Sequence, residues 1–381
     1  MRAHPGVTRA PGGSVATSGP AGPAGAARRQ RAGREGPRRV RTGRAVGVAT
    51  AALAVAMLIG VSVGPAGLPV WQVGEALLAR LPWQPHLAVP AVAVIIVWQV
   101  RLPRVILGAL VGAMLAGSGA AYQGVFRNPL ADPYLLGVAA GGGLGATMII
   151  VTGAPGTLLP PAAFAGAVIA VALTYLLGSG AGRDAGRTGG SAGAIVLAGV
   201  AVGTLLTAIQ TYLQQEHSQT LQEIYSWILG GLSLASWSDV AIMLPYAAVA
   251  AVALLAHRRL LDVLRIGETE AASLGVDITR LRLTIVAAAT LAAAAAVAVS
   301  GLIGFVGLIV PHTVRLIAGA SYRVVLPVSM IGGAAFLVLA DVAARTVQTP
   351  AEVPIGVITA AIGAPFFLFV LRSRRARQDL A

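Results

Sequence analysis

The feature that most constrains the fold is a run of residues, 105–126, that carries no charged side chain. It lies between Arg104 and Arg127, and it is rich in glycine and alanine. A helix rises about 1.5 Å per residue, so about twenty residues cross the roughly 30 Å hydrocarbon core of a bilayer. The run therefore predicts a membrane span. Small residues at 108, 112, 117 and 119 favour close approach of neighbouring helices.

The whole chain repeats this pattern. Of its 381 residues, 56% are hydrophobic and only 11% are charged, whereas about a quarter of the residues in a soluble domain are charged. We therefore expect an all-α polytopic membrane protein. Ten apolar runs are candidate helices of a membrane domain over 45–372: 45–64, 102–122, 134–153, 161–178, 193–213, 239–256, 284–300, 302–318, 324–344 and 355–371.

Basic residues indicate how these spans are oriented. The net charge is +14, and the arginines gather in residues 1–44, in alternate loops and after residue 371. Ten spans with both termini in the cytoplasm place most of them inside, as the positive-inside rule requires. Residues 1–44 are predicted to form a disordered cytoplasmic tail, and residues 373–381 a second cytoplasmic tail. A nucleic-acid-binding arm is the less favoured interpretation, so we expect contact with membrane lipid and not with nucleic acid.

Two residue types are absent from the chain. It has no cysteine, which excludes thiolate chemistry. It has no lysine either, and a Walker A phosphate loop needs one. If ATP drives this protein, a separate subunit must bind the ATP. We expect no directly bound cofactor and no metal site, since His312 has no second ligand nearby in the sequence and is better explained by helix packing.

The stretch 101–137 closely resembles the FecCD family, the permease subunits of ABC importers for iron-siderophores, haem and cobalamin. The family pattern begins with RxPR, continues through a glycine-rich span that ends in glutamine, and closes with NPLAxPxxLG. Met114 is a departure, since a small residue is commoner there. The resemblance extends from residue 98 to about 372 and includes these structural or pathway positions: Gln123, Asn128, Pro129, Leu130, Gly199, Pro311, Pro354 and Gly356.

The resemblance implies a type II ABC importer permease in a bacterial inner membrane. Two copies, identical or homologous, would share a central, mainly apolar pathway, with ATPase subunits on the cytoplasmic side and a substrate-binding protein outside. The cargo would be a bulky metal chelate, with ferric siderophore first and haem or cobalamin next. Such a permease is not itself an enzyme.

Three arginines break the positive-inside rule, because the topology places Arg101, Arg104 and Arg345 on the outside. One explanation is local: the side chains reach lipid headgroups, or Arg345 pairs with Asp341 four residues earlier in the same helix. The family resemblance implies instead that all three meet glutamates of the binding protein, and this is the interpretation we favour. Glu352 is a candidate partner for Arg345.

The largest inner loop, 257–283, is predicted to contain two short helices separated by Gly267. Its pattern resembles the segment of the family that docks in a groove of the ATPase, through Gly267, Glu268, Ala271, Leu274 and Gly275. An ordinary solvated loop is the alternative, but a short helix with an apolar face is suited to docking.

Two other functions are possible in principle. An ion-coupled secondary transporter normally keeps ionisable groups at membrane depth, and only Asp341 could lie within a span. An intramembrane serine protease would need glycine two residues before its nucleophile; Ala116 precedes Ser118 and Leu177 precedes Ser179. Neither pattern fits well.

Overall fold

The computed structural model describes residues 42–80, 89–183 and 192–378. The described part is helical and contains no strand. Most of the predicted tail, residues 1–41, lies outside these ranges. Residues 42–44 were predicted to be disordered, but they form the first turn of a helix, because the apolar stretch that follows continues the same helix without a break. Helix also extends through residue 378 of the predicted C-terminal tail.

The first half of the chain begins with a long helix, then short helices, then the central span. In order, its elements are α2 (Thr42–Ser62), α3 (Val70–Leu78), α4 (Ala91–Ile95), the π-helical turn η1 (Ile96–Arg101), α5 (Leu102–Val125), α6 (Val138–Thr152), the 3-10 turn η2 (Gly156–Leu158), α7 (Leu159–Arg183) and α8 (Ala192–Glu216). Helix α3 is short and lies between the first two predicted apolar runs. Residues from α4 onward run into α5 as one long helix.

The second half repeats the alternation of long spans and short helices. Its elements are the 3-10 turn η3 (Ser218–Thr220), α9 (Leu221–Ile228), α10 (Trp237–Leu264), α11 (Glu268–Ser273), α12 (Ile278–Ser300), α13 (Val306–Ala318), α14 (Tyr322–Thr346) and α15 (Ile355–Gln378).

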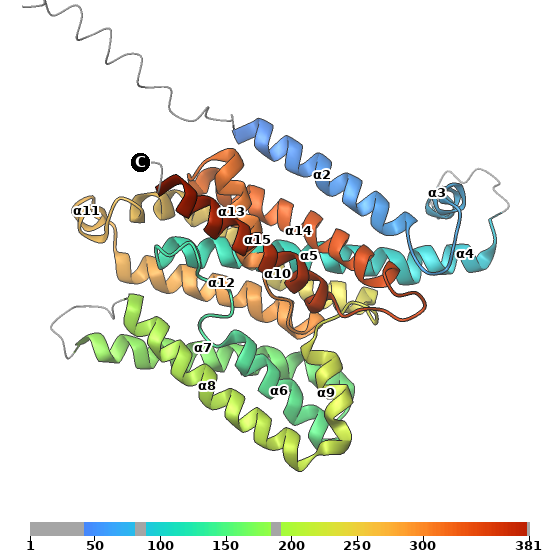
Figure 1. Ribbon diagram of the computed structural model, residues 1–381, viewed down its shortest axis with the longest axis horizontal. Coiled ribbons are helices and arrows are strands. Elements are labelled where there is room, and N and C mark those ends of the chain that lie inside the picture. The colour runs from blue at the N-terminus through green and yellow to red at the C-terminus, as the bar shows by residue number, and fades with distance from the viewer. Residues whose placement is uncertain (1–41, 81–88, 184–191, 379–381) are drawn as a thin grey trace, which may run out of the picture. The chain divides into compact units, whose positions relative to one another are not determined.

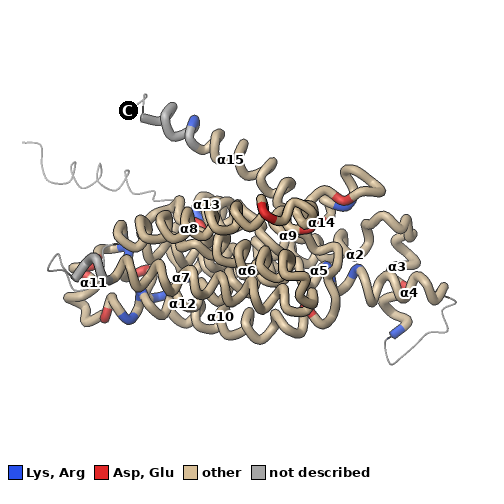
Figure 2. The backbone as a smooth tube through the Cα atoms, turned by 90° about the horizontal axis from the view of Figure 1, so that it is seen from below, with Lys and Arg blue, Asp and Glu red and all other residues tan. Residues whose placement is uncertain are grey.

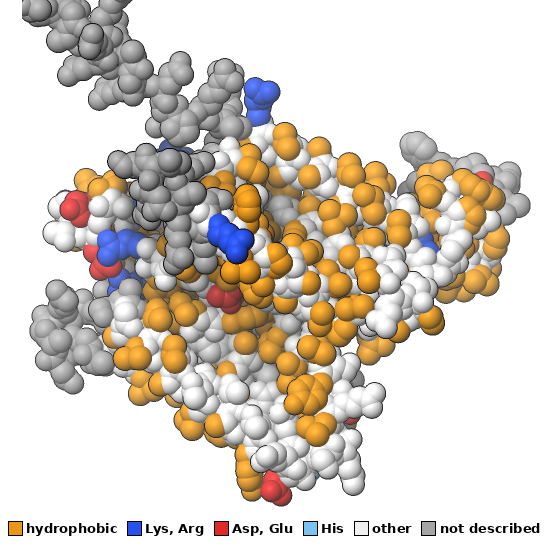
Figure 3. All heavy atoms as spheres, viewed as in Figure 1, with side chains coloured by type: hydrophobic (Ala, Val, Ile, Leu, Met, Phe, Trp, Pro, Cys, Tyr) orange, Lys and Arg blue, Asp and Glu red, His pale blue; other side chains and the backbone are white. Residues whose placement is uncertain are grey.

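Helix α5 is the centre of the bundle. It contacts α10, α12, α13 and α14, while α2 covers α14 on one side (Figure 1). Helices α6, α7 and α8 pack on one another and join the rest through α12. Charged residues lie mainly near the ends of the helices (Figure 2), and the face seen in Figure 3 is largely apolar. This distribution is the one expected of helices that face lipid.

Seven helices in the described residues are long and apolar enough to cross a membrane, and three more apolar helices are shorter. Each of the ten predicted runs overlaps one of these. Two of the three short ones begin later than predicted: α6 starts at Val138 instead of residue 134, and α13 starts at Val306 instead of residue 302. Thirteen residues of helix extend only about 20 Å, so α13 is too short to cross a bilayer alone.

The non-helical segments before α6 and α13 meet each other. The Tyr134 hydroxyl donates to the Ile303 carbonyl at 2.9 Å and accepts from the Ile303 amide at 3.0 Å. Unpaired backbone groups are costly where water is scarce. One tyrosine therefore satisfies both backbone groups of a residue that sequence periodicity had assigned to a helix.

The predicted pair of short helices in 257–283 is partly wrong. Residues 257–264 continue α10 instead of forming a separate helix, and only α11 is short and independent. Gly267 and Gly275 flank α11 with φ of +147° and +81°. These angles suit glycine, and they turn the chain into and out of the short helix.

Close packing of α5 on α14 rests on glycine. A Cβ added at Gly112 would lie 2.2 Å from the Gly333 carbonyl oxygen, which belongs to backbone and cannot easily move. We expect Gly112→Ala to lower stability by about 1–3 kcal/mol, the range seen for overpacking. The thermal denaturation midpoint of the purified protein measures this.

Gly203→Ala is the matched control, because nothing lies within 4 Å of a Cβ added at Gly203 in α8. Alanine there should be neutral or stabilising by up to about 1 kcal/mol through helix propensity. Equal midpoints for the two variants would contradict the packing argument.

Candidate functional site

Five charged residues form a cluster near the start of α5, and we call it the arginine cluster. Its members are Arg101, Arg104, Asp341, Arg345 and Glu352. The three arginines are 3%, 6% and 2% exposed, so none of them projects from the surface in this conformation. The sequence analysis predicted these arginines at the outer mouths of their spans, free to meet a partner, whereas the structure shows that their side chains are buried. Three guanidinium groups and two carboxylates leave one excess positive charge.

Arg104 is the hub of the cluster. Its Nε and Nη2 donate to Asp341 Oδ1 at 2.9 and 2.8 Å, and its Nη1 and Nη2 donate to Glu352 at 2.8 and 2.9 Å. Paired N–H groups facing paired carboxylate oxygens form the strongest arginine interactions. Glu352 was predicted to pair with Arg345, but it lies on Arg104, and this hydrogen bonding lowers the pKa of its carboxyl below the ordinary value.

The other two arginines cap helix α2. Arg101 Nη1 donates to the carbonyls of Val61 and Ser62, each at 2.8 Å, and Arg345 Nη2 donates to the Gly60 carbonyl at 2.6 Å. The last carbonyls of a helix have no partner within it, and the negative end of its dipole favours cations. Arg345 also forms the predicted i,i+4 pair with Asp341, at 3.4 Å. The cluster therefore joins α2, α5 and α14.

The predicted coupling segment lies beyond the opposite end of α5. Glu268 accepts from Arg282 Nη2 at 2.8 Å and lies 3.6 Å from Arg127 Nη2. The first residue of α11 is thereby tied to α12 and to the loop that follows α5. Ala271 is buried, whereas Leu274 is 67% exposed. The residue directly after this short helix thus presents an apolar side chain to the surroundings, while the helix itself is anchored through Glu268 and Ala271.

Most of the remaining predicted motif residues shape the backbone. Gln123 Nε2 donates to the carbonyls of Ala131 and Gly307, and its Oε1 accepts from Arg315. Asn128 Oδ1 accepts from the Leu130 amide at 2.9 Å, which closes a turn through Pro129. Leu130 itself is exposed.

Three of these positions lie in or before later helices. Pro311 is buried within α13, and Pro354 immediately precedes α15. The Gly356 amide donates to the Leu229 carbonyl at 3.1 Å, and a Cβ there would lie 2.4 Å from the same oxygen. His312 packs edge-on against Phe366 of α15 with ring centroids 6.0 Å apart, which confirms the helix-packing interpretation.

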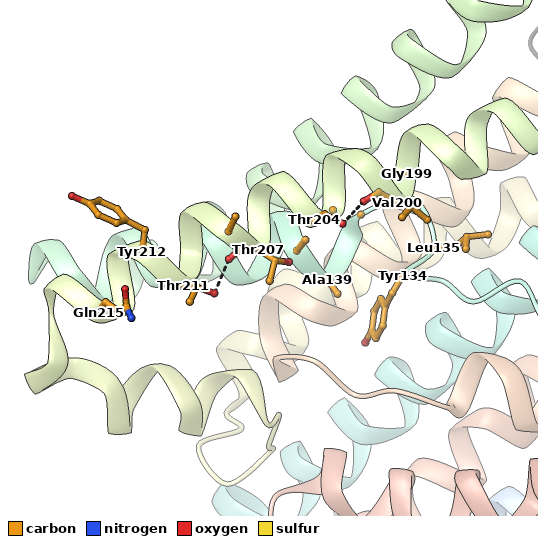
Figure 4. A pocket seen from close by; sticks show the side chains of 14 residues that line it. Tyr134, Leu135, Ala139, Gly199, Val200, Thr204, Thr207, Thr211, Tyr212 and Gln215 are labelled. Carbon is orange, nitrogen blue, oxygen red and sulfur yellow. Dashed lines mark hydrogen bonds between the residues drawn. The ribbon is translucent and has the colours of Figure 1, made fainter.

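A groove of about 860 Å³ runs between α8 and the segment that leads into α6 (Figure 4). Glycine, alanine and hydroxyl-bearing residues make up most of its lining, which includes Tyr134, Gly137, Gly199, Gly203, Thr204, Thr207 and Thr211. Thr204 and Thr211 donate to carbonyls one turn earlier in α8. Of this groove, sequence reasoning singled out Gly199 and also Gly137, the last residue of the family pattern in 101–137. The spacing of the threonines at 204, 207 and 211 was the signal that could have revealed the rest.

Burial raises the pKa of Asp132, in the turn between α5 and α6, to about 6, although the Tyr134 amide bonded to it acts in the opposite direction. A raised carboxyl pKa means that folding is disfavoured once the unfolded chain has ionised. The cost is absent below about pH 4, grows between pH 4 and 6, and is complete above 6. We expect Asp132→Asn to raise the denaturation midpoint at pH 7.5 and to leave it unchanged at pH 4.

The asparagine side chain in Asp132→Asn keeps an oxygen that can accept from the Tyr134 N–H, so the turn itself should persist in this variant. Asp239→Asn, at the first turn of α10, is the control, because Asp239 accepts from Ser236 in a capping box and gains from being charged. A midpoint that falls at pH 7.5 in Asp132→Asn would show that the carboxylate is stabilising and would contradict this prediction.

Comparison with known proteins identifies the family to which this architecture belongs. The sequence profile of the FecCD transport family matches residues 52–373. The chain is 43% identical to the cobalamin import system permease protein of Halobacterium salinarum over 290 residues, covering 76% of each chain. It is 39% identical to the hemin transport system permease protein of Yersinia pestis, covering 74% of this chain and 85% of that one.

A solved structure gives the same result for the fold. This structure, of a provisionally assigned metal-chelate type ABC transporter in an inward-facing conformation, aligns with a TM-score of 0.75 and 29% identity. The alignment covers 87% of this chain and 99% of the other. Motifs, helix arrangement and relatives agree, and the chain belongs to the FecCD transport family of membrane-spanning ABC permeases.

Proposed function

We propose that this chain is the permease subunit of an ATP-driven importer of a bulky metal chelate, with a ferric siderophore as the first candidate cargo and haem or cobalamin next. The observation that carries the proposal is the family match over 52–373, together with relatives that are named for cobalamin and hemin import. We further propose ten spans in a bacterial cytoplasmic membrane, with both termini inside. The seven long and three shorter apolar helices support that count, with the non-helical residues 301–305 before α13 completing its span.

The groove beside α8 is our candidate for part of the cargo pathway. Small side chains and hydroxyls that bond to their own helix leave a wide, weakly interacting wall, which suits a large chelate that must pass without being held. Much of α8 and α15 presents large apolar side chains outward, including Leu197, Val200, Leu205, Leu368 and Phe369. These surfaces support a dimer, identical or heterologous, in which a second copy closes the pathway.

Two kinds of partner complete the proposed assembly. ATPase subunits would bind the cytoplasmic face through α11, with Gly267 and Gly275 setting its angle and Leu274 entering their groove. A substrate-binding protein would dock at the arginine cluster on the outer face, where the excess positive charge favours an acidic surface. ATP binding and hydrolysis in the partner would then switch the pathway between outward and inward access.

Ion-coupled secondary transport is less well supported. Such a transporter needs an acidic group that can gain and lose an ion within the membrane. Asp341 is the one carboxylate among the described residues that lies well inside an apolar span, and it is held by both Arg104 and Arg345. Two guanidinium groups are already paired with this carboxylate, so it is not available to bind a coupling ion.

Affinity purification of the tagged chain from its native membrane, followed by mass spectrometry, tests the proposal. We expect a stoichiometric ATPase, and a binding protein whose ligand can then be screened with ferric siderophores, haem and cobalamin. ATP-dependent uptake of that ligand into proteoliposomes would complete the test. A chain that purifies alone and supports uptake without nucleotide would overturn the ABC assignment.

A further inference from the structure

The three arginines of the arginine cluster are not equivalent. Arg101 and Arg345 are occupied by the last carbonyls of α2, and both are almost completely buried. Gly64, in the turn after α2, lies directly against Arg101: a Cβ added there would be 3.2 Å from Nε and Nη2. Using either arginine to bind a partner would uncap α2 and displace that turn. These two side chains are therefore built to hold α2 in place.

Arg104 differs because one of its two bonded carboxylates is accessible. The Asp341 side chain is 2% exposed, whereas the Glu352 side chain is 31% exposed. Asp341 occupies the Nε edge of the guanidinium, and Glu352 occupies the edge formed by Nη1 and Nη2. A group approaching from outside thus meets Glu352 first, and behind it a guanidinium edge already arranged to bind a carboxylate.

The segment that carries Glu352 is lightly attached. Residues 347–352, between α14 and α15, are all exposed. The backbone is fixed just after this segment, where the Val353 amide donates to the Ala344 carbonyl at 2.9 Å and the Ile355 amide donates to the Gly230 carbonyl at 3.2 Å. Glu352 could leave Arg104 by movement of this exposed segment, without disturbing α5, α14 or the cap on α2.

We propose that Glu352 is an internal stand-in for a carboxylate of the docking protein, and that docking exchanges the two on the outer edge of Arg104. The inference rests on the proposed docking at this face and adds which arginine is used and what must move. In such an exchange one carboxylate replaces another on Arg104. Arg104 therefore stays paired with two carboxylates, Asp341 keeps Arg104 as its partner, and α2 remains capped. The excess positive charge of the cluster favours a partner that is itself acidic.

The exchange makes Glu352 a competitor, and removing the competitor should strengthen docking. We expect Glu352→Gln to lower the Kd of the binding protein about ten-fold, because a neutral amide bonds a guanidinium less strongly than a carboxylate does. The probe is the purified binding protein that supports uptake through this chain. Kd is measured on the complete transporter in phosphatidylcholine nanodiscs, whose zwitterionic headgroups carry no net negative charge to compete for Arg104.

Glu223→Gln is the matched control. Glu223 is an exposed acid in the first turn of α9 and has no part in the arginine cluster. Its replacement by glutamine removes the same charge as Glu352→Gln does. A second measurement follows the segment itself: the chain lacks cysteine, so Thr349→Cys carries a single environment-sensitive fluorophore. We expect its emission to change when the binding protein saturates the transporter, and to be partly changed beforehand in Glu352→Gln.

Arg104→Lys separates this inference from the docking that it assumes. Weaker binding by Arg104→Lys, with Glu352→Gln unchanged or weaker, would leave docking in place and overturn the exchange. If neither variant alters Kd, docking at this cluster is itself wrong. An equal gain in affinity for the binding protein in Glu223→Gln would show that the loss of any surface negative charge strengthens binding. That result would also overturn the exchange.

Discussion

Replacing Arg104 with alanine should destabilise the protein more than any other single change in the arginine cluster. The variant leaves Asp341 buried without its main partner and Glu352 without any, and an unpaired buried charge costs about 3–5 kcal/mol. Arg345 cannot replace the hydrogen bonds from Arg104 to Asp341, because it approaches Asp341 only through its Nε, which lies 3.4 Å from Oδ2. We expect a large fall in the thermal denaturation midpoint and in the yield of folded protein.

The matched control is Arg280→Ala. Arg280 also pairs with an acid, Asp277 at 3.1 Å, but its side chain is 89% exposed, and exposed pairs contribute about 1 kcal/mol or less. Adding Asp341→Asn to Arg104→Ala should restore part of the lost stability, because the stranded charge is removed. Normal stability of Arg104→Ala, or no rescue by the second change, would show that the cluster does not hold α2, α5 and α14 together.

Introducing a charge at Leu274 should prevent the ATPase subunit from binding to the permease. Leu274 follows α11 and is largely exposed, so Leu274→Asp has little cause to unfold the permease. Full burial of a leucine on docking contributes about 1.5–3 kcal/mol, and an aspartate placed in the same groove adds a desolvation cost. Since 1.4 kcal/mol is about a factor of ten in affinity, we expect at least a ten-fold loss of ATPase association and loss of ATP-driven uptake.

Leu234→Asp provides the comparison. Leu234 is 93% exposed and lies between α9 and α10, in the part of the chain predicted to face outward. It should leave ATPase association unchanged while testing whether any new charge on an exposed leucine disturbs the protein. Intact co-purification of the ATPase with Leu274→Asp would exclude this residue from the docking surface.

Most of the helices could be located from hydropathy, because a long apolar run in a bilayer has to satisfy its own backbone and helix is the local way to do so. The predicted runs failed where backbone groups are satisfied at a distance. Tyr134 bonds both polar groups of Ile303, and so residues 301–305 need not be helical. Likewise α10 continues past residue 257, where Asp262 accepts from the Ser321 hydroxyl and the Tyr322 amide, distant contacts that a local pattern does not encode.

The sequence alone determined that this chain is a lysine-free membrane protein with an unusual set of arginines, since composition and charge distribution are properties of the linear chain. Its motifs also carried the resemblance to a permease family. Only the tertiary structure decided what those arginines bind. Arg104 meets Asp341 and Glu352 across separations of 237 and 248 residues, and Arg345 meets Gly60 across 285. The pairing of buried charges depends on which helix ends come together in space, and helix packing settles that.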